Sequence, residues 1–179
     1  MKSLATPQQK ISKNAVRKIS ESVFAPLCVL LVESCEVPVQ RVPGLPDEVF
    51  IRGKTPMTKQ EVRAAALAKL AVKTTDILWD IGAGTGSVSI EMALAAPLGY
   101  VYAVECDPEA CGLIRQNRER FHACNLTLVE GRAPAALADL PAPDAVFIGG
   151  TKGGMEPCWM KCSARIRTHA SAFRPLRWK

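Results

Sequence analysis

From residue 76 onward, short apolar runs alternate with longer segments of mixed polarity. The apolar runs are typical of buried strands, and four strands are predicted: 77–81, 100–105, 126–130 and 145–148. The mixed segments suit helices, which are predicted over 87–96, 107–123 and 133–140. Strands that alternate with helices at this spacing form parallel βαβ units, so the predicted fold class is α/β, a parallel sheet with helices on its faces.

Two of the helices begin with capping signals. Thr58 stands as an N-cap with Glu61 three residues later, which is the spacing of a capping box, and strong helix formers follow over 64–71. Asp107 and Pro108 stand as the N-cap and the first position of the helix after the second strand. We therefore expect Thr58 and Asp107 to cap their helices.

The N-terminal part of the chain does not follow this alternation. Residues 1–22 are polar and basic, and 23–33 form an apolar run that suits a buried strand without a partner nearby in sequence. Residues 35–57 are rich in proline and glycine, which indicates a linker or a long ordered loop.

Composition narrows the class of protein. A chain of 179 residues with 48% hydrophobic residues can bury one core, which excludes a disordered or fibrous chain. No apolar run reaches about 18 residues and no signal-peptide core follows the N-terminus, so we expect neither a membrane span nor secretion. The net charge of +6 is concentrated toward the two ends, which indicates solvated tails and no specific nucleic-acid binding.

The seven cysteines are odd in number and irregular in spacing. This usage is typical of free thiols in a reducing compartment and predicts a cytoplasmic protein. Cys158, Cys162 and His169 lack the second ligand pair that a zinc site needs, so no metal site is predicted.

The segment from Asp80 to Gly86 (DIGAGTG) lies between a predicted strand and a predicted helix. Glycine lets the backbone turn sharply and lets a ligand approach where a Cβ atom would collide. The Gly-x-Gly-x-Gly spacing differs from the dinucleotide pattern, and the Gly-Lys-Ser/Thr ending of a P-loop is missing. The turn therefore indicates a cofactor without a pyrophosphate.

Two further polar sites follow the next two strands. Glu105 ends the second predicted strand, where a carboxylate can accept hydrogen bonds from both hydroxyls of a ribose. Residues 130–133 (EGRA) follow the third strand, in the loop that would meet an adenine edge. Three such sites in register after neighbouring strands point to one binding site.

The glycine turn, Glu105 and residues 130–133 together resemble the S-adenosylmethionine site of class I methyltransferases. A narrower resemblance, to the decarboxylating precorrin methyltransferases of cobalamin biosynthesis, covers about residues 23–154. The segments that carry it are 46–63 (PDEVFIRGKTPMTKQEVR), 79–84 (WDIGAG) and 149–154 (GGTKGG). The resemblance implies a Rossmann-like class I methyltransferase fold, and C-methylation of a precorrin with decarboxylation of an acetate arm.

The resemblance also implies which residues hold the cofactor, S-adenosylmethionine. Thr58 and the glycine turn would contact its methionine portion, Glu105 its ribose and the backbone at Ala133 its adenine, while Asp80 would order the turn. Because an N-cap hydroxyl is already engaged, Thr58 would use its backbone carbonyl. The predicted cofactor-binding residues are Thr58, Asp80, Gly82, Ala83, Gly84, Thr85, Gly86, Glu105, Gly131, Arg132 and Ala133.

A precorrin carries many carboxylate groups, and four basic residues lie close to the predicted capped helix. They are predicted to bind substrate: Arg52, Lys54, Lys59 and Arg63. Arginine pairs carboxylates bidentately and lysine acts as a point charge; the alternative is that all four are solvated loop charges. No residue is predicted for the methyl-transfer or decarboxylation chemistry itself. The sequence is compatible with a homo-oligomer but does not predict one.

Members of that family stand alone or follow a tetrapyrrole methylase domain. We therefore predict four regions: a remnant of the preceding domain at 1–34, a linker and substrate-side loop at 35–57, the cofactor domain at 58–154, and an atypical tail at 155–179. A family member would continue beyond Gly154 with a helix and three strands. The tail shows neither the hydrophobic periodicity of a helix nor that of a strand. We expect a truncated or frame-shifted chain, incomplete on its C-terminal side, with low stability and weak or no activity.

Two alternatives remain at this stage. One is a class I methyltransferase that acts on RNA or protein, which the basic ends favour and residues 46–63 disfavour. The other is a remnant that binds the cofactor without catalysis.

Overall fold

The computed structural model describes residues 43–150 and 155–166. Its helices are α2 (Gln60–Leu70), α3 (Ser87–Ala95), α4 (Pro108–Arg120) and α5 (Met155–Ser163), with 3-10 turns η1 (Asp47–Val49) and η2 (Ala135–Leu137). Its strands are β1 (Ile77–Ile81), β2 (Tyr100–Glu105), β3 (Leu126–Glu130) and β4 (Ala145–Ile148). The apolar run predicted as a strand at 23–33 and the predicted domain remnant at 1–34 lie outside the described residues.

The four strands form one parallel sheet in the order β3-β2-β1-β4. Trp79 in the centre of β1 pairs with Tyr102 of β2 on one side and with Val146 of β4 on the other. All four predicted strands are confirmed, and the α/β fold class with them. Because the strands are parallel, their carboxyl ends meet at one edge of the sheet, where ligands bind in open α/β folds.

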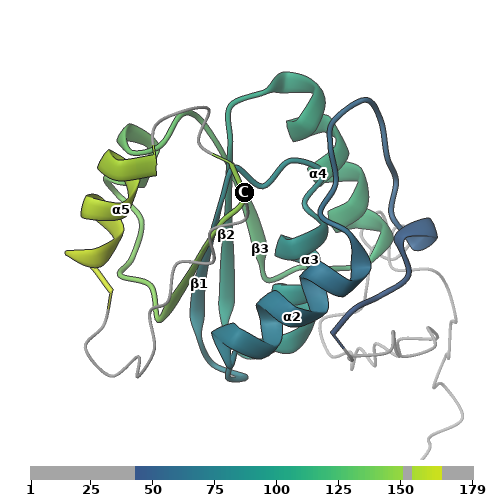
Figure 1. The fold of residues 1–179 in the computed structure, drawn as a ribbon, viewed down its shortest axis with the longest axis horizontal. Helices are drawn as coiled ribbons and strands as arrows, with labels where there is room; N and C mark the ends of the chain where they lie inside the picture. The colour runs from purple at the N-terminus through teal and green to yellow at the C-terminus, as the bar shows by residue number, and fades with distance from the viewer. Residues whose placement is uncertain (1–42, 151–154, 167–179) are drawn as a thin grey trace, which may run out of the picture. The chain divides into compact units, whose positions relative to one another are not determined.

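Helices cover both faces of this sheet (Figure 1). α2, α3 and α4 lie on one side, and α5 lies on the other. Successive residues of β1 point to opposite faces, as the pleat requires. Leu78 packs into the core beneath α2, α3 and α4, whereas Trp79 packs into the core that contains Leu137 and Cys162.

The start of α2 differs from the prediction. The helix begins at Gln60, and the preceding Lys59 makes no side-chain cap, so the capping box of Thr58 and Glu61 is wrong. The Thr58 carbonyl instead accepts a hydrogen bond from the Arg63 guanidinium one turn into the helix. That buried guanidinium fixes the backbone of the residue that precedes the N-cap position, Lys59, but it does not cap the free N–H groups of the helix.

The start of α4 follows the prediction. The Asp107 carboxylate accepts hydrogen bonds from the backbone N–H groups of Glu109, at 2.9 Å, and Ala110, at 3.4 Å. The helix predicted over 133–140, by contrast, shortens to the 3-10 turn η2.

Residues 43–59, which we call the strap, are an ordered segment whose only regular element is η1. Leu45 and Phe50 are buried, and the Phe50 ring centroid lies 4.9 Å from that of Phe121 at the end of α4. The proline- and glycine-rich segment predicted as a linker or an ordered loop is therefore an ordered loop over its described part.

Helix α5 corrects the prediction that the tail from residue 155 has no helical period. Cys158 and Cys162, one helical turn apart, are both buried, and burial raises the pKa of Cys162 to about 12. The pattern did not predict this helix because its described buried residues are two cysteines, which give a weak apolar signal in the sequence. Beyond it, Arg165 donates hydrogen bonds to carbonyls at the end of η2, and its guanidinium lies 5.3 Å from the Trp79 ring centroid.

Among residues 43–150 and 155–166, no helix is both long and apolar enough to cross a bilayer. The same residues hold no group of three or more His, Cys, Asp or Glu side chains arranged to bind a metal ion.

Candidate functional site

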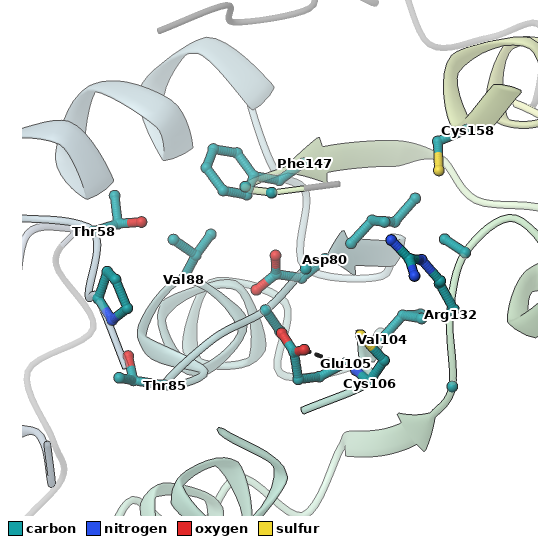
Figure 2. A pocket seen from close by; sticks show the side chains of 18 of the residues that line it. Thr58, Asp80, Thr85, Val88, Val104, Glu105, Cys106, Arg132, Phe147 and Cys158 are labelled. Carbon is teal, nitrogen blue, oxygen red and sulfur yellow. Dashed lines mark hydrogen bonds between the residues drawn. The ribbon is translucent and has the colours of Figure 1, made fainter. Parts of the chain in front are cut away.

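A pocket of about 460 Å³ opens at the carboxyl edge of the sheet, within the size range of small-molecule sites. Residues at the ends of all four strands line it, together with the strap and α5 (Figure 2). In Figure 2, Thr58 and Thr85 lie at one end of the pocket and Arg132 and Cys158 at the other, with Asp80 and Glu105 between them. The pocket therefore lies where the sequence predicted the cofactor.

The glycine turn after β1 has a backbone that only glycine adopts readily. Gly82, Gly84 and Gly86 all have positive φ angles, of 71°, 57° and 77°. A Cβ atom on Gly82 would lie 1.9 Å from the Gly150 carbonyl oxygen, so the backbone after β4 approaches too closely for any side chain there. The glycines thus bring the turn against the ends of two strands.

The Glu105 carboxylate ties this turn to the end of β2. Its Oε2 accepts a hydrogen bond from the Gly84 N–H at 2.9 Å. Its Oε1 accepts from the N–H groups of Cys106, at 2.7 Å, and Asp107, at 2.9 Å. An ionised carboxylate has about four acceptor positions, so these three bonds leave capacity for a ligand hydroxyl. Glu105 therefore orders the turn as well as facing the pocket.

Asp80 is fully buried and polar at the base of the pocket. Its Oδ2 accepts a hydrogen bond from the Ser89 hydroxyl, while its Oδ1 has no hydrogen-bond partner among the described residues. Burial raises the pKa of Asp80 to about 7, the nearby Glu105 charge adds to the rise, and the bonds from Ser89 oppose it. Thr85 Oγ1 is likewise buried without a described partner. Because unpaired buried oxygens are costly, the two point to a polar or cationic ligand.

Most of the predicted cofactor residues line this pocket. They are Thr58, Asp80, Gly82, Ala83, Thr85, Glu105, Gly131, Arg132 and Ala133. Gly84 and Gly86 are not among the lining residues. The Gly84 N–H donates to Glu105, and at Gly86 an added Cβ atom would lie only 3.0 Å from the Ile114 side chain. Whether these residues bind the cofactor stays a prediction.

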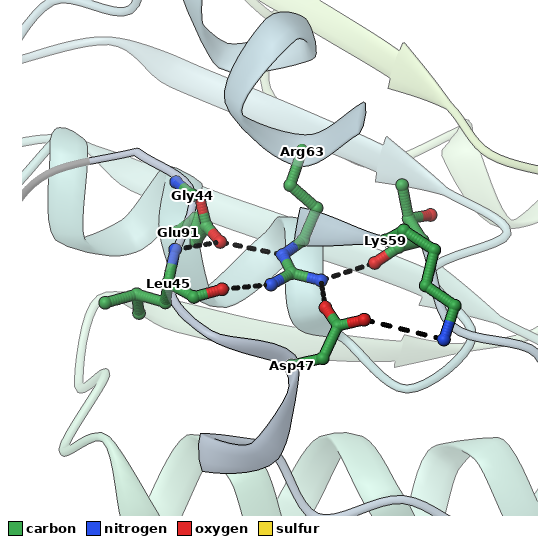
Figure 3. Close-up of polar contacts among 7 residues, drawn as sticks. Gly44, Leu45, Asp47, Lys59, Arg63 and Glu91 are labelled. Atoms are coloured by element: carbon green, nitrogen blue, oxygen red, sulfur yellow. Dashed lines mark hydrogen bonds and ion pairs between the residues drawn. The ribbon is translucent and has the colours of Figure 1, made fainter. Parts of the chain in front are cut away.

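The predicted substrate residues do not form one group. Arg63 cannot meet a substrate, because its side chain is fully buried and pairs with Glu91 and Asp47, each at 2.7 Å (Figure 3). Lys59 is exposed and lies 3.5 Å from the Asp47 carboxylate. Arg52 and Lys54 are exposed on the strap outside the lining of the pocket. The prediction for Arg63 is therefore wrong.

Several residues at or behind the site were not predicted. Phe147 and Cys158 line the pocket, and Glu91 and Asn117 hold the strap behind it. The last two had a signal in the sequence, because Glu91 is the one charged residue of α3 and Asn117 follows apolar residues one turn earlier in α4. Phe147 and Cys158 had none, since their positions depend on how β4 and α5 close the fold.

The parallel sheet, the glycine turn after β1 and the carboxylate that closes β2 define a class I methyltransferase fold. Residues 46–173 match the family model for the precorrin methyltransferase domain, and the chain belongs to this family. The matched range begins later than the predicted resemblance and continues past Gly154. The expectation that the chain leaves the family pattern at that residue is therefore corrected.

Relatives and solved structures agree with this assignment. A probable cobalt-precorrin-6B C(15)-methyltransferase (decarboxylating) from Pyrobaculum calidifontis is 50% identical over 117 residues, which are 64% of this chain and 59% of that protein. The structure of precorrin-6Y C5,15-methyltransferase from Geobacter metallireducens matches with a TM-score of 0.68 and 46% identity, covering 70% of this chain and 67% of that chain.

A third match is to the C-terminal domain of precorrin-6Y C5,15-methyltransferase from Rhodobacter capsulatus. It has a TM-score of 0.65 and 38% identity, and covers 72% of this chain and 68% of that chain. The chain thus matches 59% of the length of the Pyrobaculum protein, and the activity of that whole protein is not carried over by the match alone.

Proposed function

We propose that the chain binds S-adenosylmethionine in this pocket and methylates carbon 15 of a precorrin, with loss of a carboxylate from an acetate arm. Family membership and the names of the relatives support the reaction and the substrate class. The observation that carries the cofactor part is Glu105, which holds the Gly84 N–H and still faces the pocket.

The charges of the pocket suit this cofactor, which carries a cationic sulfonium and ammonium. The buried Asp80 carboxyl, with its unpaired Oδ1, would face the cationic portion, and the unpaired Thr85 hydroxyl would accept or donate a further bond. Glu105 would hold the ribose through its remaining acceptor positions. Arg132 lies at the end of the pocket opposite Thr58 (Figure 2), and the adenine would lie there, near the lining residues Gly131 and Ala133 that flank Arg132 in the sequence.

S-adenosylmethionine supplies a methyl group that its sulfonium already activates, so the chain needs no nucleophile of its own. The protein aligns the methyl group with the acceptor carbon and surrounds them with fixed dipoles. Both effects can lower the activation free energy of methyl transfer substantially. The Glu105 carboxylate accepts one hydrogen bond from the glycine turn and two from the loop after β2, and so ties the turn to that loop.

For the substrate, we propose contacts from Arg52 and Lys54. Both are exposed on the strap, which also supplies Pro56, Met57 and Thr58 to the pocket. A guanidinium and an ammonium at this position suit a macrocycle rich in carboxylates. The double variant Arg52→Gln, Lys54→Gln should raise KM for the precorrin and leave cofactor affinity unchanged.

The proposed function is tested with cobalt-precorrin-6B and S-adenosylmethionine labelled in the methyl group. We expect label to enter the macrocycle together with release of carbon dioxide. Transfer to RNA or to protein substrates with none to the precorrin would contradict the proposal. So would methyl transfer without carbon dioxide release.

A further inference from the structure

Arg63 is a fully buried arginine whose partners come almost entirely from one segment. Its Nε donates to Glu91 Oε1 and its Nη1 to Asp47 Oδ1, each at 2.7 Å. It also donates to the carbonyls of Leu45 and Thr58 (Figure 3). Glu91 apart, all these partners belong to the strap.

The contacts of this guanidinium fix both ends of the strap. Its face lies 4.7 Å from the Phe50 ring centroid, and Glu91 of α3 accepts further bonds from the N–H groups of Gly44, at 2.7 Å, and Leu45, at 3.1 Å. Partial burial tends to raise the pKa of Asp47, but bonds and charge from Arg63 and Lys59 hold it below its ordinary value. The pair is therefore ionised at neutral pH.

Asn117 of α4 makes a second attachment, nearer the pocket. Its Oδ1 accepts from the Ile51 N–H at 2.8 Å, and its Nδ2 donates to the Ile51 carbonyl at 3.0 Å. The same Nδ2 donates to the Thr85 carbonyl at 2.9 Å. One buried amide thus joins the middle of the strap to the glycine turn.

A buried ion pair is a poor source of stability, since desolvation offsets much of the attraction. Arginine is nevertheless suited to fixing several groups at once, because its planar fork donates in defined directions. Here those directions run to both ends of the strap. Residues 56–58 of the strap line the pocket, and Thr58 lies at the end opposite Arg132 (Figure 2).

We propose that Arg63 and Asn117 are positioning residues that hold Pro56, Met57 and Thr58 against the methionine end of the bound cofactor. The inference rests on the proposed function and assigns a selective role within it. Loosening the strap should weaken contacts to the aminocarboxypropyl chain and spare those to the adenosine, which Glu105 and residues 131–133 supply. The strap therefore sets affinity for one part of the ligand only.

The test uses two ligands that differ in that part: S-adenosylhomocysteine, and 5′-methylthioadenosine, which lacks the amino acid chain. Calorimetry would compare wild type with Arg63→Lys, Asp47→Asn and Asn117→Asp. Asp47→Asn keeps the shape of the side chain and tests the attachment even if Arg63→Lys does not fold. Exposed residues give matched controls, Arg120→Lys at the end of α4 and Asp139→Asn after η2.

We expect the three strap variants to bind S-adenosylhomocysteine about tenfold more weakly, with affinity for methylthioadenosine unchanged. The controls should match wild type for both ligands. Equal weakening of both ligands, or of neither, in folded variants would overturn the inference while leaving the proposed function standing. Failure of the folded wild type to bind either ligand would refute the proposed function and the inference with it.

Discussion

The Gly84 N–H donates a hydrogen bond to the Glu105 carboxylate across 2.9 Å, and so joins the turn after β1 to the end of β2. Because Glu105 also accepts from Cys106 and Asp107, one side chain orders both loops at the mouth of the pocket. The carboxylate predicted to hold a ribose therefore also orders the turn that is predicted to contact the methionine portion of the cofactor.

Glu105→Gln should weaken S-adenosylmethionine binding by about 1–3 kcal/mol, because the amide replaces one acceptor oxygen with a donor that faces backbone N–H groups. Calorimetry of the purified variant measures the change. Glu119→Gln, on the exposed side of α4, is the matched control and should bind as wild type does. If both variants bound S-adenosylmethionine with equal affinity, Glu105 would order the loops without contacting the cofactor.

Asp80→Asn should change how stability depends on pH. Because burial raises the pKa of Asp80 to about 7 in the folded state, the folded protein holds a proton that the unfolded chain loses near 3.8. The contribution of Asp80 to the free energy of unfolding of the wild type is therefore greatest below about pH 4. It is lost as the pH rises toward 7. The melting temperature of Asp80→Asn relative to wild type should rise between pH 5 and pH 8.

The exposed Asp139 gives the control for this titration. Asp139→Asn should shift the melting temperature by the same small amount at both pH values. A difference between Asp80→Asn and wild type that is constant with pH would show that Asp80 is ionised throughout this range.

Arg165→Met tests whether the tail is part of the fold. Methionine keeps much of the side-chain volume over Trp79 but loses the hydrogen bonds to the carbonyls of Leu137, at the end of η2, and of the two later residues Ala138 and Leu140. We expect a loss of about 1–3 kcal/mol in the free energy of unfolding. Lys161→Met on the exposed side of α5 should leave the thermal melt unchanged, and an equal melt for both variants would contradict the structural role of Arg165.

The strands and the backbone of the glycine turn could be predicted because their signals are local. The runs at 77–81 and 126–130 are apolar enough to be strands in any α/β sheet, and the glycines of the turn have one backbone role. The burial of Arg63 could not be predicted, because it depends on Glu91 and Asp47 meeting from distant parts of the chain. Its neighbours in the sequence predicted that Arg63 is a surface charge. In the structure, its ion pairs with residues distant in the sequence hold it in the core.

The same reason explains the errors at Thr58 and in the tail. A capping box is a local pattern, whereas the helix begins one residue later than that pattern predicts, and the Thr58 carbonyl is held by the distant end of the buried Arg63 side chain. Helix α5 owes its place to packing against the core around Trp79, which its own sequence pattern does not reveal. The prediction of low stability, made when the tail seemed to lack structure, stays a prediction.

The central claim is that the glycine turn forms the S-adenosylmethionine site. Gly84 has a φ of 57°, and a Cβ atom there would lie 3.3 Å from the Pro56 carbonyl oxygen, so Gly84→Val forces a branched residue into a strained backbone. Gly112→Ala is the control, because a Cβ at that helical position meets no atom within 4 Å. Calorimetric titration of both variants and wild type with S-adenosylmethionine tests the claim most directly. We expect one-site binding in wild type and Gly112→Ala and none in Gly84→Val; equal affinity in all three, or no binding by the folded wild type, would contradict it.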